Sequence, residues 1–190
     1  MEESNKNRKD KKLGYIFNAN IKIDYIIRKS MSKIKNNMDI FEIEMKLDEA
    51  RYYHNILEKE EKAIKICDEI LKIDTNNRDA LSIKAGSLPY IGKEKEAFEL
   101  TSKIIEMWPD YWEGYYLLGF LYFNVNENMA IEAFKKSIEL EENFDNLIAL
   151  AQLLYFLQDP GYEACLIKAK KLNPQRFKKY MKNYWEWGIC

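Results

Sequence analysis

Apolar side chains recur at helical spacing along most of this chain. Two neighbouring stretches show it best, because each places small or apolar side chains three or four residues apart on one face. The first face holds Tyr115, Leu118, Gly119 and Tyr122. The second holds Ala130, Phe134, Ser137 and Leu140. A short polar break separates the two stretches, which predicts two amphipathic helices folded back on each other.

The same pattern repeats towards the N-terminus. Counting back from Trp112 in steps of 34 residues reaches Arg78 and then Glu44. In this register a small residue stands wherever two helices of a unit must cross closely. These residues are Ala63, Ala97 and, with a loop one residue shorter, Ala130.

This register resembles the tetratricopeptide repeat family, whose pattern combines Leu-Gly, Tyr and Ala-x3-Phe with a period of about 34 residues. Gly92 falls on the family's turn glycine and Pro109 on its closing proline. The Leu-Gly pair is replaced in two units, by Ala50-Arg51 and Lys84-Ala85. Pro89 should end the first helix of the second unit early. The resemblance implies an all-α, right-handed solenoid of antiparallel helix pairs, with units at about 44–77, 78–111, 112–144 and 145–174.

The ends of the chain differ from these repeats. We expect a flexible tail over 1–12 and a basic amphipathic segment over 13–38, whose isoleucine stripe would cap the stack. The same stripe would also suit an anionic membrane surface. Residues 39–174 carry the repeats, and 175–190 should form an aromatic C-terminal capping helix with room for a partner or a second copy.

Charge is distributed unevenly. The net charge is -1, but residues 1–37 carry 10 basic and 4 acidic side chains, residues 175–190 carry 4 and 1, and the middle therefore holds -10. An acidic array repels phosphates, so a nucleic-acid ligand for the repeats is disfavoured. The start lacks the apolar run of a secretory signal and no stretch is long enough to span a membrane. A cytoplasmic protein with its 3 cysteines reduced is expected.

Catalytic chemistry is not indicated. The single histidine, His54, falls on a core face, and one histidine with dispersed cysteines does not make a zinc site. Many acidic residues stand four positions from a lysine, as Glu58 does from Lys62 and Glu132 from Lys136, which predicts solvated ion pairs. We therefore expect no catalytic residues, no cofactor and no metal, and so no enzyme.

The resemblance implies a binding surface instead, because the first helix of each repeat lines the concave side of such a stack. The basic clamp that some members use for a peptide carboxylate is missing, since its positions hold Asp48, Tyr52, Ile83, Glu113 and Leu117. Between the core positions the first helices carry an aromatic strip in acidic surroundings. We define the aromatic strip as Tyr52, Tyr90, Tyr116, Phe120, Phe123 and Phe156, with Glu113 beside it.

Aromatic side chains are frequent anchors of binding. The strip therefore predicts a non-catalytic adaptor or scaffold for a peptide or protein segment with apolar and basic side chains. Three alternatives remain open at this level. The aromatic residues could belong to the core. The N-terminal segment could fill the groove of a structural, oligomer-forming subunit, with the C-terminal helix as its homo-oligomer contact. The basic ends could also dock on nucleic acid or a membrane.

Overall fold

A computed structural model describes residues 38–186 of the chain, with side chains from 40 to 182. The chain divides into two units, Met1–Glu49 and Ala50–Cys190, and the division falls within the first described helix. The predicted tail and most of the predicted N-terminal cap lie outside the described residues. The predicted repeats therefore belong almost entirely to the second unit.

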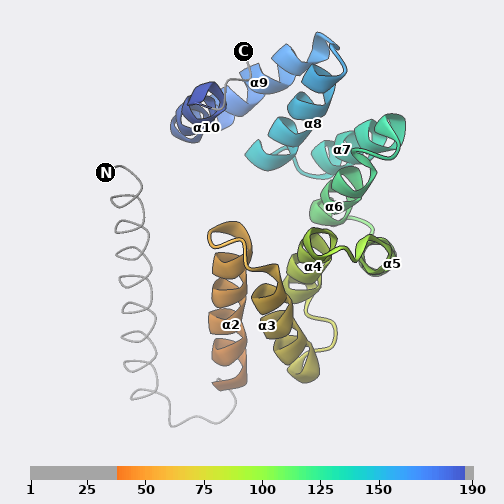
Figure 1. Cartoon of the computed structure of the whole chain (residues 1–190), viewed down its shortest axis with the longest axis vertical. Helices are drawn as coiled ribbons and strands as arrows, with labels where there is room; N and C mark the ends of the chain where they lie inside the picture. Colours follow the sequence, from red (N-terminus) through yellow and green to blue (C-terminus); the bar gives the residue numbers. More distant parts are fainter. Residues whose placement is uncertain (1–37, 187–190) are drawn as a thin grey trace. The chain divides into compact units, whose positions relative to one another are not determined.

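The described residues form antiparallel helix pairs and contain no strand (Figure 1). We number the helices in chain order as four successive pairs, the first of which begins with α2, and a last helix follows the fourth. Their bounds are α2 Met38–Asn55, α3 Glu60–Ile73, α4 Arg78–Ser87, α5 Glu94–Met107, α6 Trp112–Tyr122, α7 Glu127–Leu140, α8 Phe144–Phe156, α9 Gly161–Leu172 and α10 Pro174–Glu186. The predicted all-α solenoid of helix pairs is therefore confirmed. None of these helices is both long and apolar enough to cross a lipid bilayer.

The second pair shows how local sequence sets the helix ends. Asn77 caps α4 by accepting a hydrogen bond from the backbone N–H of Ala80 at 3.0 Å. The helix ends at Ser87, as Pro89 predicts, and a 3-10 turn, η1, follows over Leu88–Ile91. Gly92 closes this turn with φ 73°, a left-handed conformation that glycine adopts without steric cost. The broken helix leaves Tyr90 on the turn, where it is 73% exposed.

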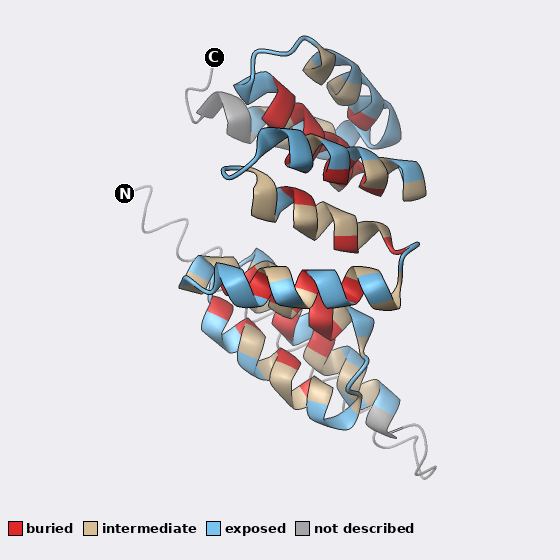
Figure 2. Ribbon diagram, turned by 90° about the vertical axis from the view of Figure 1, so that its right-hand side faces the viewer, coloured by how far each residue is buried: buried red, intermediate tan, exposed pale blue. Residues whose placement is uncertain are grey.

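Buried residues recur along the helices of the second unit (Figure 2) and form clusters both within pairs and between successive pairs. The three alanines predicted at helix crossings, Ala63, Ala97 and Ala130, are fully buried. In the third pair Phe134 of α7 is fully buried beneath α6, directly against Gly119. A Cβ atom at position 119 would lie 2.5 Å from the Phe134 ring, which is why the first helix needs glycine there.

A buried polar contact joins the third pair to the fourth. Asn143 and Asn146 form a capping box at the start of α8, each side chain bonding the other's backbone. Asn146 is fully buried, and its amide also donates to Ser137 Oγ at 3.3 Å and to the Glu141 carbonyl at 2.6 Å. One side chain therefore fixes the end of α7 and the beginning of α8.

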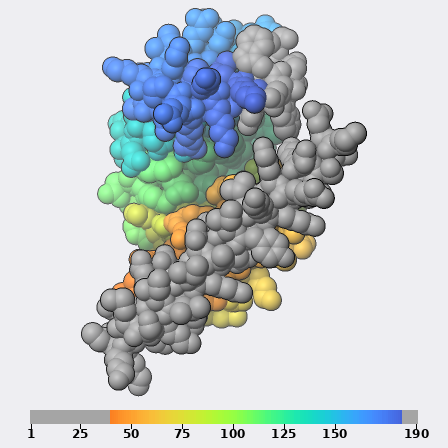
Figure 3. Space-filling model, turned by 90° about the vertical axis from the view of Figure 1, so that its left-hand side faces the viewer, coloured from red at the N-terminus to blue at the C-terminus, as the bar shows by residue number. Residues whose placement is uncertain are grey.

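The last helix packs on the fourth pair. Phe177 and Tyr180 of α10 lie against a buried cluster that includes Phe144 and Leu147 of α8 and Ala169 of α9. The atoms of α10 lie directly against the preceding helices in the space-filling view (Figure 3). Helix α10 therefore covers an apolar surface that the fourth pair would otherwise expose.

Two ion pairs expected from sequence spacing are wrong. Glu58 lies in the turn after α2 with φ 49°, so it does not share a helix face with Lys62, whose ammonium lies 5.3 Å from the Tyr53 ring centroid. On α7 the pairs form at a spacing of three residues, with Lys135 on Glu132 at 3.2 Å and Lys136 on Glu139 at 2.9 Å. These pairs are solvent-exposed and contribute little to stability.

The thiols of Cys67 and Cys165 are free. Cys67 is fully buried in α3, and burial, followed by the neighbouring Asp68, raises its pKa to about 12. Burial also raises the pKa of the Cys165 thiol, but that side chain is only half-buried. Because the reagent must reach a thiolate, we expect iodoacetamide at pH 8 to leave Cys67 unmodified while Cys165 reacts. Peptide mass spectrometry of the alkylated native protein measures both sites. Equal labelling of Cys67 and Cys165 before denaturation would contradict the packing of α3.

Candidate functional site

The first helices of the second and third pairs lie close together. Helix α4 contacts α6 directly, whereas no comparable contact joins α5 to α7 among the described helices. We call α4, η1 and α6 the first-helix layer, because they belong to the first halves of the second and third pairs. The predicted strip residues of α6 and η1 belong to this layer.

The centre of the aromatic strip lies on α6. The rings of Tyr116 and Phe120 meet edge to face with centroids 4.8 Å apart, and Trp112 stacks on Tyr116 from the preceding turn at 5.8 Å. Phe120 is 43% exposed even though its ring also lies 5.3 Å from that of buried Phe134. Phe120 therefore exposes an apolar ring to solvent while Tyr116 and Phe134 contact that ring.

Some strip residues contribute to the core instead. Tyr116 and Phe123 pack against the buried cluster around Phe134 and Leu153, and both are half-buried. Burial raises the pKa of the Tyr116 phenol, and the nearby Asp145, Glu113 and Tyr90 raise it further. Groups from η1, α6 and α8 therefore act electrostatically on one phenol.

The remaining strip residues differ in their surroundings. Tyr90 is 73% and Phe156 is 68% exposed. The ring centroids of Tyr90 and His54 are 6.2 Å apart, and Phe156 makes no ring contact in the described part of the chain. Tyr52 is half-buried on α2, with its ring 6.0 Å from that of Tyr53. The structure therefore brings Glu113, Tyr116 and Phe120 together on α6, with Tyr90 on the turn η1 that follows α4. Tyr52 lies on α2 and Phe156 at the end of α8.

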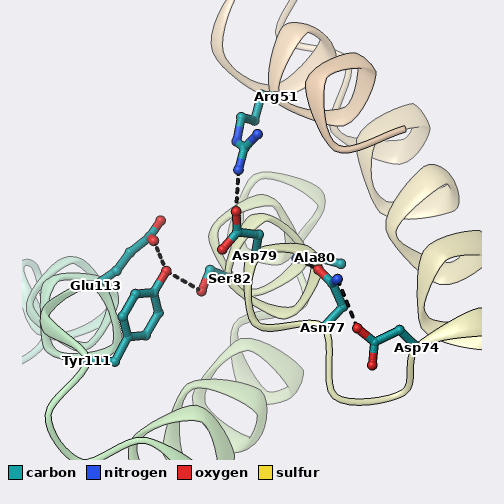
Figure 4. A network of polar contacts seen from close by, with 8 residues as sticks. All are labelled: Arg51, Asp74, Asn77, Asp79, Ala80, Ser82, Tyr111 and Glu113. Carbon is teal, nitrogen blue, oxygen red and sulfur yellow. Dashed lines mark hydrogen bonds and ion pairs between the residues drawn. The ribbon is translucent and has the colours of Figure 1, made fainter. Parts of the chain in front are cut away.

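A polar network lies at the start of α4 and α6 (Figure 4). Arg51 of α2 pairs with Asp79 of α4. The Tyr111 hydroxyl donates a hydrogen bond to Glu113, and Ser82 Oγ donates to the same hydroxyl at 3.4 Å. The guanidinium of Arg78 lies 4.2 Å from the Tyr111 ring centroid. The carboxylate of Glu113, a predicted site residue, thus accepts a hydrogen bond from the Tyr111 hydroxyl.

Glu113 differs electrostatically from its neighbours. Burial raises the pKa of its carboxyl and Asp79 adds to this, while the Tyr111 hydrogen bond and the more distant Arg51 and Arg78 lower it. Within the described residues Glu113 forms no ion pair. Asp79 has Arg51, and Asp145 has a bidentate pair with Arg176 at 2.5 and 3.0 Å. Because arginines neutralise Asp79 and Asp145, the surroundings of the strip are less acidic than the sequence indicates. Of these three carboxyl groups, Glu113 is the one without a direct counter-ion among the described residues.

Sequence reasoning did not identify these arginine partners. Arg51 and Asp79 are 28 residues apart, and Asp145 and Arg176 are 31 apart, which is close to one repeat. Opposite charges at this separation in a solenoid lie on neighbouring helix pairs. That spacing was the signal available in the sequence.

His54 has two polar neighbours, and both meet the same ring nitrogen. Glu60 Oε2 lies 2.7 Å and Ser87 Oγ 3.1 Å from its Nδ1. A nucleophile–base–acid relay needs the serine and the carboxylate on opposite nitrogens, so this arrangement does not activate Ser87, which is fully buried. Within residues 38–186 there is also no group of three or more side chains able to hold a metal ion.

The sequence matches no family model, and no curated protein matches it. Solved structures do match. TTC0263, a thermophilic tetratricopeptide repeat protein of Thermus thermophilus, is 17% identical with a TM-score of 0.62 over 70% of this chain and 75% of that one. MamA of Desulfovibrio magneticus RS-1, from residue 41 to the end, is 23% identical with a TM-score of 0.53 over 70% and 76%.

A third match is the structure of Naa15/Naa10 bound to HypK-THB. It is 28% identical with a TM-score of 0.58 over 70% of this chain, which spans only 20% of the matched chain. Together these likenesses show that the fold is that of a tetratricopeptide repeat protein, and they confirm the resemblance indicated by the sequence. Folds of this class are interaction scaffolds in general, because stacked helix pairs present extended surfaces.

Proposed function

We propose that the protein is a non-catalytic adaptor that binds a peptide or protein segment on the first-helix layer around Tyr90, Glu113, Tyr116 and Phe120. One observation carries this proposal: Phe120 exposes 43% of its surface while Tyr116 and Phe134 contact its ring, and Tyr90 on the turn after α4 is 73% exposed. Exposed aromatic side chains on a rigid helical scaffold are suitable binding anchors, because little conformational entropy is lost when they are covered.

The fold supports the same proposal. The matched structure of 28% identity is a complex in which Naa15/Naa10 is bound to HypK-THB, so a related arrangement of helices accompanies protein binding there. The arrangement around His54 offers no activated nucleophile, and this favours binding over catalysis.

Site-specific photocrosslinking in the source cell tests the proposal. A photoreactive phenylalanine analogue replaces Phe120 in one variant and the exposed Glu132 of α7 in a control. We expect a discrete adduct with another polypeptide at position 120 and none of that mass at position 132. Identical adducts at both positions, or adducts formed only with further copies of this chain, would contradict an adaptor surface at Phe120.

A further inference from the structure

Three features of α6 define what the proposed surface can recognise. Glu113, Tyr116 and Phe120 are three and four residues apart, so they follow one face of the helix. Glu113 is a desolvated carboxyl without an ion pair in the described chain, Tyr116 offers a phenol, and Phe120 offers an exposed ring. We propose that this face binds an extended partner segment with a Lys or Arg side chain on Glu113 and an apolar side chain on Phe120, three residues apart.

The charges around Glu113 are the reason to expect a basic side chain in the partner. Each carboxylate near Glu113 already has an arginine of this chain, Asp79 through Arg51 and Asp145 through Arg176. Arg78 is stacked on Tyr111 and only weakly favours the charged form of Glu113. A partly buried carboxylate without a counter-ion is costly, and a cation from a partner relieves that cost. The Tyr111 hydrogen bond holds one carboxylate oxygen and orients the group.

The spacing of three residues in the partner follows from the distance between Glu113 and Phe120 along α6. Glu113 and Phe120 are seven residues apart, which corresponds to about 10 Å along a helix at 1.5 Å per residue. An extended segment covers this distance in about three residues at roughly 3.3 Å each. An extended ligand is favoured because its backbone N–H and C=O groups are unpaired, and the phenols of Tyr116 and Tyr90 can bond them.

This inference rests on the proposed function, and one experiment separates the two. Random dodecapeptides displayed on phage are selected on the full-length protein and sequenced. We expect enrichment of a Lys or Arg three positions from an apolar residue, in one chain direction. Selection on Glu113→Gln should lose the basic position and keep the apolar one, and selection on Phe120→Ala should do the reverse. Glu132→Gln, a matched change of an exposed carboxylate on α7, should select the wild-type pattern.

The selected peptides distinguish failure of the inference from failure of the proposed function. Peptides enriched for apolar residues alone would overturn the role of Glu113 while leaving the adaptor surface intact. A basic residue at another spacing, seven included, would overturn the extended path along α6. No enrichment above background would overturn both the inference and the proposed function.

The Glu113→Gln variant also supplies a control for folding. A folded-state carboxyl whose pKa is raised binds protons more readily than in the unfolded chain, so its ionisation destabilises the fold as pH rises through that window. Gln removes the charge and can still accept the Tyr111 hydrogen bond. We expect its melting temperature at pH 7 to equal or exceed that of wild type, while affinity for a selected peptide falls at least tenfold. A lower melting temperature would overturn the premise that the charge of Glu113 lacks a partner within the fold.

Discussion

Replacement of Gly119 by alanine is expected to destabilise the protein by about 2–3 kcal/mol, because overpacking a well-filled core costs about that much. The added Cβ would lie 2.5 Å from Cδ1 and Cε1 of Phe134, whose ring is fully buried and is enclosed by Tyr116 and Phe120. The ring must therefore shift against these neighbours to admit the added Cβ. Urea unfolding followed by far-UV circular dichroism measures the change in the free energy of unfolding.

Gly86 provides the matched control. It is also helical, but the nearest atoms to an added Cβ, Leu117 Cδ2 and His54 Nε2, are at 3.4 and 3.6 Å, which is ordinary contact. Gly86→Ala should be neutral or stabilise by up to about 1 kcal/mol through helix propensity. Combining Gly119→Ala with Phe134→Leu should cost less than the sum of the single changes. Equal effects at the two glycines would contradict the close approach of α6 and α7.

The second large effect is expected at Asn146. Asn146→Ala removes the acceptor of the Asn143 N–H and the donor to Ser137 Oγ and the Glu141 carbonyl, all at a buried position. Leaving buried polar groups unpaired should cost about 3 kcal/mol. Chemical denaturation of the purified variant measures this loss.

Asn126 is the control for this change. It is the N-cap of α7 and accepts a hydrogen bond from the Met129 N–H at 3.1 Å, as Asn143 does at the start of α8, but it is solvent-exposed. Asn126→Ala should cost only about 1 kcal/mol, the usual value of an N-cap. If both asparagines gave the same loss, the buried contact between α7 and α8 would not be the source of the effect.

The sequence was sufficient for the fold because the features that set it are local. Pro89 and Gly92 end the first helix of the second pair, and the alanines at 63, 97 and 130 mark where helices cross. The helix end depends on backbone conformation at one or two positions, and each helix crossing depends on side-chain volume at one position. Aligning the repeats in one register shows such positions in the sequence.

The sequence did not reveal which residues of the aromatic strip are buried and which are exposed. Helix α6 is apolar on nearly all sides, so periodicity alone cannot separate Tyr116, which packs against the core, from Phe120, which is exposed. Whether a ring on such a helix is buried depends on how completely other helices surround it, because Phe134 lies near both rings and yet leaves Phe120 43% exposed. The charge around Glu113 likewise depends on Arg51 and Arg176, which come from other helix pairs.

Binding of the segment cross-linked at position 120 to a Tyr90→Ala/Phe120→Ala variant tests the central claim most directly. These two aromatic residues are exposed, so the variant should keep its helical signal and lose less stability than Gly119→Ala. We predict that affinity falls at least tenfold, as expected when binding anchors are removed. Unchanged affinity, or a loss of stability as large as that of Gly119→Ala, would show that these rings serve the fold and not a partner.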